Sequence, residues 1–179
     1  MVSMVNRTSI TCGDDTRAPE CFVEGIDWSA TALPASVARS YQERIVNGEQ
    51  LILQGDIMGP DPFQPKILFG VNEVWVGAVD TTDQYFVMDG VFVMEKFNGT
   101  FCITAPCPNI AETRLNANRS ATIADIDFDD AGLSDETVNR ALEAVNTDGL
   151  IVVGERYYSQ GEKGRTAAQV FMKAAVPQF

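Results

Sequence analysis

A segment near the start of the chain recurs about 100 residues later, and this repeat constrains the fold more than any other feature of the sequence. The segment that begins at Phe22 aligns with the one that begins at Thr122. After one skipped residue, the segment from Asn47 aligns with the one from Asn146. Eight of about 36 aligned positions are identical, against roughly two expected for unrelated segments of average composition. The identical pairs are Ile26 with Ile126, Asp27 with Asp127, Leu33 with Leu133, Glu43 with Glu143, Asn47 with Asn146, Leu51 with Leu150, Ile52 with Ile151 and Gly55 with Gly154.

Each copy has the pattern of a strand, a helix and two further strands. Apolar residues alternate before the helix, and the helix is followed by LILQGDI in the first copy and LIVVGERYY in the second. The helices carry apolar stripes at helical spacing, which are expected to lie on a sheet. The stripes are Val37, Ala38, Tyr41 and Ile45, and Val138, Ala141, Leu142 and Val145. In the second copy, Ser134 is placed as the N-cap. The sequence predicts an α+β fold of two pseudo-repeats, each with one helix packed on a mainly antiparallel β-sheet.

We expect residues 1–179 to form one compact unit, with pseudo-repeat 1 at about 1–80 and pseudo-repeat 2 at about 84–179. Strand-like segments begin at Tyr85, in YFVMDGVFVMEKF, and at Asn109, in NIAETRLN. Their counterparts in the first copy would precede residue 1. The first pseudo-repeat is therefore expected to lack an N-terminal strand.

Four cysteines form two local pairs, Cys12 with Cys21 and Cys102 with Cys107. An even count in short loops favours two disulfides, which implies an extracytoplasmic location. The alternatives are free buried thiols and a four-cysteine zinc site. Structural zinc pairs usually have two to four residues between their cysteines, whereas eight separate Cys12 from Cys21.

The chain resembles a mostly bacterial family of secreted, cysteine-bearing domains of unknown function. The resemblance rests on CITAPCPNIAETRLN at 102–116, on TIADIDF, on a helix that opens with LSDE, and on DGLIVVGE, with a partial earlier copy in TCGDDTRAPECFVEGIDW. It implies an exported protein and a fold shared over nearly the whole chain. No activity is assigned to that family, so the resemblance implies nothing about chemistry.

The charge balance argues against several classes of partner. Thirteen basic and 25 acidic residues give a net charge of −12, which repels nucleic acids and anionic lipids. The longest apolar stretch, at 67–79, is interrupted by Asn72 and Glu73 and is shorter than the roughly 20 residues of a membrane span. The N-terminus MVSMVNRTSI lacks the pattern of a signal peptide. We expect a secreted or periplasmic protein, no nucleic-acid partner and no membrane span.

Catalytic motifs are missing from the sequence. It contains no histidine, the commonest general base, and no nucleophile elbow, phosphate-binding loop or dinucleotide fingerprint. We therefore assign no catalytic residue and no cofactor. The sequence favours a protein that is not an enzyme.

A run of acidic residues resembles a calcium-binding loop. Asp125, Asp127, Asp129 and Glu136 have the spacing of the first, third, fifth and twelfth ligands of an EF-type loop. The sixth position is Asp130, where the sharp turn requires glycine. The four residues are a weak calcium candidate, and a solvated strand edge followed by an acidic helix start is the favoured interpretation.

Asp27 and Asp127 occur in the same Ile-Asp-aromatic context in both copies. A pair of carboxylates that work together is one interpretation. The favoured one is a structural turn, in which each side chain accepts hydrogen bonds from backbone N–H groups between the strand and the helix.

The most promising binding feature is the loop between Cys102 and Cys107. A short disulfide loop stiffened by proline is pre-organised, so Ile103, Thr104, Ala105 and Pro106 are the candidate binding residues. The favoured function is a non-catalytic extracytoplasmic binding or interaction module, with a protein or small molecule as its ligand. The alternatives are a protease inhibitor that uses this loop and a carboxylate-based hydrolase, which would need a cleft where acids of both halves converge.

Overall fold

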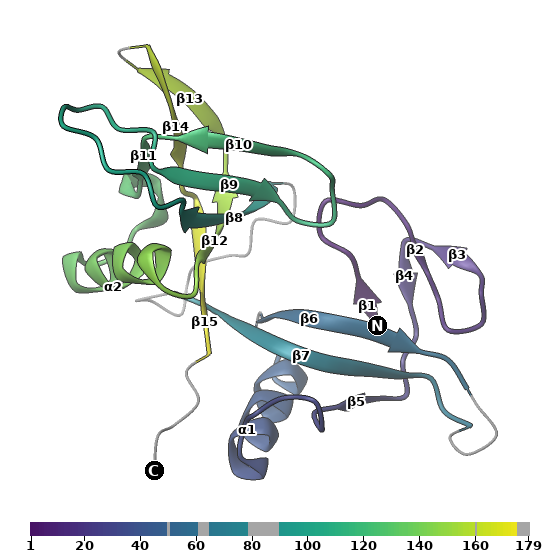
Figure 1. Cartoon of the computed structure of the whole chain (residues 1–179). Helices are drawn as coiled ribbons and strands as arrows, with labels where there is room; N and C mark the ends of the chain where they lie inside the picture. The colour runs from purple at the N-terminus through teal and green to yellow at the C-terminus, as the bar shows by residue number, and fades with distance from the viewer. Residues whose placement is uncertain (50, 61–64, 79–89, 160, 175–179) are drawn as a thin grey trace. The chain divides into compact units, whose positions relative to one another are not determined.

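The computed structural model describes residues 1–49, 51–60, 65–78, 90–159 and 161–174 (Figure 1). The chain divides into two compact units. Unit 1 comprises Met1–Trp75 with Ala174–Phe179, and unit 2 comprises Val76–Lys173. Each unit is described by itself. The predicted strand at Tyr85 lies outside the described residues as far as residue 89, and its remainder is strand β8 (Val91–Phe97).

Unit 1 contains short strands and one helix. Strand β1 (Val2–Ser3) pairs with β4 (Glu20–Cys21), and β2 (Ile10–Thr11) pairs with β3 (Arg17–Ala18), both antiparallel. Strand β5 (Gly25–Asp27) runs parallel to β7 (Leu68–Gly77), which also pairs with β6 (Leu51–Met58). Helix α1 (Ala35–Val46) lies between β5 and β6 in the chain.

Unit 2 has two sheets. In the larger one β10 (Ser120–Ile123), β9 (Ile110–Arg114), β8, β12 (Leu150–Gly154) and β15 (Gln169–Lys173) are neighbours in this order, and all these pairs are antiparallel. In the smaller sheet β14 (Glu162–Thr166) lies between β11 (Asp125–Asp127), its parallel partner, and β13 (Arg156–Ser159), its antiparallel partner. Helix α2 (Asp135–Asn146) follows a short 3-10 helix, η1 (Asp129–Ala131). The α+β class with mainly antiparallel sheets is confirmed.

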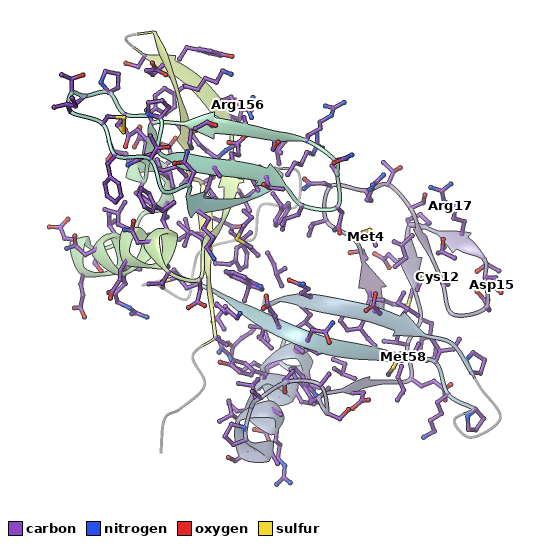
Figure 2. All side chains as sticks on the ribbon, viewed as in Figure 1. Met4, Cys12, Asp15, Arg17, Met58 and Arg156 are labelled. Carbon is purple, nitrogen blue, oxygen red and sulfur yellow. A yellow bond between two sulfur atoms is a disulfide. The ribbon has the colours of Figure 1, made fainter. Side chains whose placement is uncertain are left out.

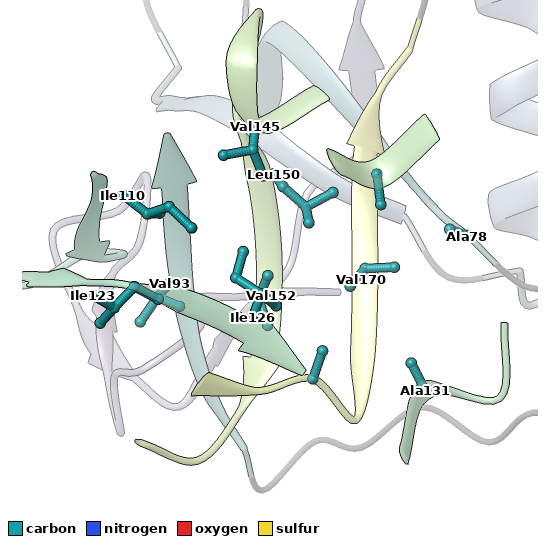
Figure 3. Close-up of a cluster of buried hydrophobic side chains, with 12 residues drawn as sticks. Ala78, Val93, Ile110, Ile123, Ile126, Ala131, Val145, Leu150, Val152 and Val170 are labelled. Carbon is teal, nitrogen blue, oxygen red and sulfur yellow. The ribbon is translucent and has the colours of Figure 1, made fainter. Parts of the chain in front are cut away.

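The core of unit 2 forms where the larger sheet meets α2 and the smaller sheet (Figure 3). Val93, Leu150 and Val152 are cross-strand neighbours or lie in phase along β8 and β12, so they point to the same face of the sheet. They are fully or almost fully buried together with Ile123 and Ala141. Apolar residues from strands distant in sequence therefore share one interior.

Helix α2 begins as expected but presents a different stripe to the core. Its N-cap is Ser134, whose Oγ accepts a hydrogen bond from the backbone N–H of Thr137, as predicted. The buried side chains are Thr137, Ala141 and Val145. The prediction that Leu142 belongs to the buried stripe is wrong, because the helix is rotated so that Leu142 remains 43% exposed.

One glycine in each unit permits a close backbone approach. A Cβ atom on Gly55 would overlap the carbonyl oxygen of Gly70, which is the cross-strand partner of Asp27. A Cβ atom on Gly154 would overlap the carbonyl oxygen of Thr166, which is the partner of Asp127. Only a residue without a side chain fits at these positions.

We expect Gly154→Ala to lower the free energy of unfolding by about 2 kcal/mol or more, because the new methyl group would displace the backbone of Thr166. Urea unfolding followed by circular dichroism measures the effect. Gly48→Ala is the control, because Gly48 has a φ of 82° but open space around it. That control should lower the free energy of unfolding only by the roughly 1–2 kcal/mol that a residue with a side chain costs in the left-handed conformation. A smaller loss for Gly154→Ala than for Gly48→Ala would contradict the steric explanation.

Candidate functional site

The four cysteines form two disulfides, Cys12–Cys21 and Cys102–Cys107, and none of them is free. The predicted pairing is confirmed, and the alternatives of free thiols and a zinc site are wrong. Cys12 lies in the N-terminal part of unit 1 (Figure 2). The second disulfide closes the tip of the β8–β9 hairpin in unit 2.

Hydrogen bonds hold the base of the hairpin loop. The backbone N–H of Asn98 donates to the carbonyl oxygen of Asn109 over 2.9 Å. The Asn98 side chain donates from Nδ2 to the Pro108 carbonyl over 3.2 Å and accepts from the Thr100 N–H over 2.9 Å. The Phe101 ring meets the Phe97 ring edge to face, with centroids 5.1 Å apart. The loop is therefore held both covalently and by its own hydrogen bonds.

The tip of this loop is apolar and open to solvent. Phe101 is 86% exposed and Ile103 is fully exposed. The other predicted binding residues, Thr104, Ala105 and Pro106, are exposed as well. Residues 98–109 contain no charged side chain, although the chain as a whole carries a net charge of −12. We define residues 98–109 as the stapled loop.

Sequence reasoning missed a buried cluster of charged residues inside unit 2. Glu95 on β8 and Glu112 on β9 are direct cross-strand partners, and their side chains are 0% and 3% exposed. Arg165 on β14 and Arg156 on β13 are cross-strand partners in the smaller sheet. A pair of acids on one sheet thus meets a pair of arginines on the other. The Arg156 side chain, labelled in Figure 2, is 37% exposed and forms the solvent side of this cluster.

The two arginines donate their hydrogen bonds to Glu112 rather than to Glu95. Arg165 donates from Nε to Glu112 Oε2 over 2.6 Å and from Nη1 to the Gly154 carbonyl over 2.6 Å, and Arg156 Nη2 donates to Glu112 Oε1. Burial opposes ionisation of Glu112, but these hydrogen bonds outweigh it and lower the pKa of its carboxyl group. Glu112 is the ionised member of the pair.

Glu95 is the protonated member. Arg165 Nε lies 3.3 Å from Glu95 Oε1, but its N–H is directed at Glu112, and neither buried Glu95 oxygen accepts a hydrogen bond among the described residues. Burial, then the negative charge of Glu112, raises the pKa of Glu95 to about 9. One proton on Glu95 allows two acids to share a dry interior.

This acid pair does not have the surroundings that the hydrolase hypothesis requires. Both acids belong to unit 2, and their side chains are closed to solvent.

The sequence contains one indication of the buried charged cluster. In VFVMEKF, Glu95 is in phase with Val91 and Val93, so strand periodicity directs a carboxyl group into the core.

Asp27 and Asp127 make the same local hydrogen bond. Asp27 Oδ1 accepts from the backbone N–H of Ser29 over 2.9 Å, and Asp127 Oδ1 accepts from that of Asp129, also over 2.9 Å. Each carboxylate thereby organises the turn after its strand. Asp27 is in unit 1 and Asp127 in unit 2, and each bonds within its own unit.

The residues of the calcium candidate have local partners. Asp125 Oδ2 accepts a hydrogen bond from Tyr157 Oη over 3.0 Å, and Asp127 bonds the turn that contains Asp129. Glu136 lies in the first turn of α2. Within the described part of the chain, no three acidic, cysteine or histidine side chains gather as a metal site would require.

A groove of about 610 Å³ lies beside α1 in unit 1. The end of β5 and the following loop form one wall, with Asp27 and Trp28, and α1 forms the other, with Arg39 and Gln42. Trp28 donates from Nε1 to Gln42 Oε1 over 3.4 Å, and its ring stacks on Tyr41 with centroids 6.4 Å apart. The groove therefore combines an aromatic surface with hydrogen-bonding groups of several kinds.

Among the residues that the structure describes, no helix is long and apolar enough to cross a membrane. Neither the characterised proteins nor the solved structures contain a match to the chain. A family model described as a domain of unknown function, DUF6748, matches residues 1–176. Since this match covers nearly every residue, the chain belongs to the DUF6748 family.

Proposed function

We propose that this protein is a non-catalytic, extracytoplasmic binding module that contacts a protein partner through the stapled loop. The observation that carries the proposal is the exposure of Phe101 and Ile103 on a disulfide-closed loop without charge. Full burial of one such side chain gains about 1.5–3 kcal/mol. Two of them, two residues apart on a restrained backbone, form a small anchor of the kind found at the centres of protein interfaces.

The rigidity of the loop supports the same function. A flexible loop loses conformational freedom when it binds, and that loss reduces affinity. In the stapled loop, the Cys102–Cys107 disulfide and the hydrogen bonds of Asn98 restrict the backbone before any partner arrives. Less of the contact energy of Phe101 and Ile103 is then needed to offset the loss of conformational freedom, so more of it contributes to affinity.

The two disulfides support an extracytoplasmic location, because disulfides form and persist in oxidising compartments and are rare in the reducing cytosol. We propose that the protein is bacterial and is exported from the cytoplasm. The net charge of −12 disfavours nucleic acids and anionic lipid surfaces as partners.

We expect a photo-crosslinking amino acid at position 103 to capture a partner protein in the extracytoplasmic fraction of the source cells. The control carries the crosslinker at the exposed position 140 on α2. Unlabelled protein should compete for the adduct, whereas the double variant Phe101→Ser, Ile103→Ser should not. Equal adducts from both positions, or equal competition by the double variant, would argue against the proposal.

Protease inhibition is the second candidate, favoured by one observation. All residues from Phe101 to Pro106 are exposed on a loop that is closed at both ends, as a substrate-like segment must be. Stoichiometric inhibition of a serine or cysteine protease by the intact protein is the expected result. Inhibition that is unchanged in Ala105→Asp and Pro106→Ala variants would discard this candidate.

We also infer that the two halves descend from one duplicated unit. The support is positional. Strands β5 and β11, and helices α1 and α2, lie 100 residues apart with equal lengths. The turn carboxylates Asp27 and Asp127, and the close-approach glycines Gly55 and Gly154, occupy matching places. We propose pseudo-repeats at about 1–80 and about 84–179 on this basis.

A further inference from the structure

We propose that the groove of unit 1 is a binding site for a small uncharged saccharide, separate from the stapled loop. The groove lies between β5 and α1, and its volume of about 610 Å³ falls within the roughly 300–1,000 Å³ typical of small-ligand sites.

The fold itself does not require an open groove at this place. One hundred residues further along the chain, side chains fill the space between the corresponding strand, turn and helix of unit 2. There Ala131 and Ala141 are fully buried, and Phe128 and Leu133 pack against the core cluster. In unit 1, Thr31 and Tyr41 stand at the positions of those alanines and remain only partly buried. The opening is therefore a local property of the side chains of unit 1.

The side chains that line the groove match a hydroxyl-rich molecule. Asp27 accepts hydrogen bonds, Arg39 donates them, and Gln42, whose Oε1 accepts from Trp28, can donate from its amide nitrogen. Sugar hydroxyl groups donate and accept in the same way. The Trp28 indole, which also stacks on Tyr41, is the apolar lining group that can contact the C–H face of a sugar ring.

Charge excludes the simplest alternative ligands. The lining contains one acidic residue, Asp27, and one basic residue, Arg39, so its formal charge is zero and it favours neither anions nor cations. Asp27 uses Oδ1 for the turn to Ser29, and Arg39 forms no ion pair among the described residues. Both groups can therefore turn hydrogen-bonding atoms toward a ligand without breaking a contact of the fold.

The test uses the two tryptophans of the full chain as separate probes. Trp28 lines the groove, whereas Trp75 is 2% exposed. N-acetylglucosamine, chitotriose, maltotriose and cellotriose are titrated into ¹⁵N-labelled protein, and both indole N–H resonances are followed. We expect at least one saccharide to shift the Trp28 resonance saturably and to leave that of Trp75 unchanged. Phosphate and glutamate should shift neither.

The matched variants are Asp27→Asn and Asp127→Asn, because asparagine preserves both turns and only the first change alters the groove. Asp27→Asn and Arg39→Gln should each weaken binding about tenfold, the loss expected for one hydrogen bond to a charged group. Asp127→Asn should bind normally. No Trp28 shift with any of the four saccharides at 20 mM, a preference for phosphate or glutamate, or equal losses for both asparagine variants would each overturn the proposal.

Discussion

Arg165→Met is expected to lower the free energy of unfolding by about 3–5 kcal/mol, because it removes the buried cation of the cluster and leaves the Glu112 carboxylate with only the partly exposed Arg156. Arg165 holds Glu112 and the Gly154 carbonyl, both over 2.6 Å, and lies 3.3 Å from Glu95. Methionine has a similar length but cannot donate a hydrogen bond. The variant thus removes the guanidinium group with little change in side-chain volume.

Urea unfolding monitored by circular dichroism measures this loss. Arg140→Met is the matched control, because Arg140 is exposed on α2 and its replacement should change stability by less than about 0.5 kcal/mol. A triple variant with Glu95→Leu, Glu112→Met and Arg165→Met should recover most of the loss, since a buried ion pair can be replaced by packed apolar side chains at little cost. A loss below about 1 kcal/mol for Arg165→Met alone would show that its charge is not needed inside unit 2.

The protein is expected to lose stability as the pH rises from about 5 to about 9, by up to about 1.4 kcal/mol per pH unit. The cause is Glu95, whose pKa in the folded protein is raised to about 9 from an ordinary value of 4.5. Between these two pH values the folded state binds a proton that the unfolded chain has released, so each rise in pH favours unfolding. Glu112 acts in the opposite sense, because its lowered pKa confers stability that is lost only as the pH falls through the acidic range.

Glu95→Gln should flatten this pH dependence, because glutamine resembles the protonated acid and does not titrate in this range. The measurement is the free energy of unfolding in urea at pH 6, 7, 8 and 9 for both proteins. Glu143→Gln, on the exposed side of α2, is the control and should keep the wild-type slope. Parallel curves for Glu95→Gln and the wild-type protein would refute the assignment of the buried proton to Glu95.

Local sequence patterns predicted the features that depend on near neighbours. Ser134 was identified as an N-cap because it precedes an amphipathic segment, and the cysteine pairs because each closes a short loop. Helices α1 and α2 lie in the two segments whose apolar periodicity predicts a helix. Each of these features involves interactions within about ten residues, so the pattern and the structure report the same physics.

Features that depend on distant partners were not predictable in the same way. The hydrogen-bonded pair Glu112 and Arg165 is 53 residues apart in the sequence. No local pattern predicts which buried acid pairs with which arginine. The burial of Thr137 in place of Leu142 depends on how α2 is rotated against the sheet, which periodicity alone leaves open. The groove beside Trp28 depends on side chains that fail to fill space, and no pattern of residue types marks an empty volume.

The parallel pairing of β11 with β14 bears on the order of folding. Asp125–Asp127 can join this sheet only after Gly164–Thr166 have been synthesised, and Arg165 arrives in the same step. The Cys102–Cys107 loop, with a sequence separation of five, can close much earlier. Contacts of long sequence separation slow folding. The interior of unit 2 should therefore be completed in a late step of folding, after the stapled loop has formed.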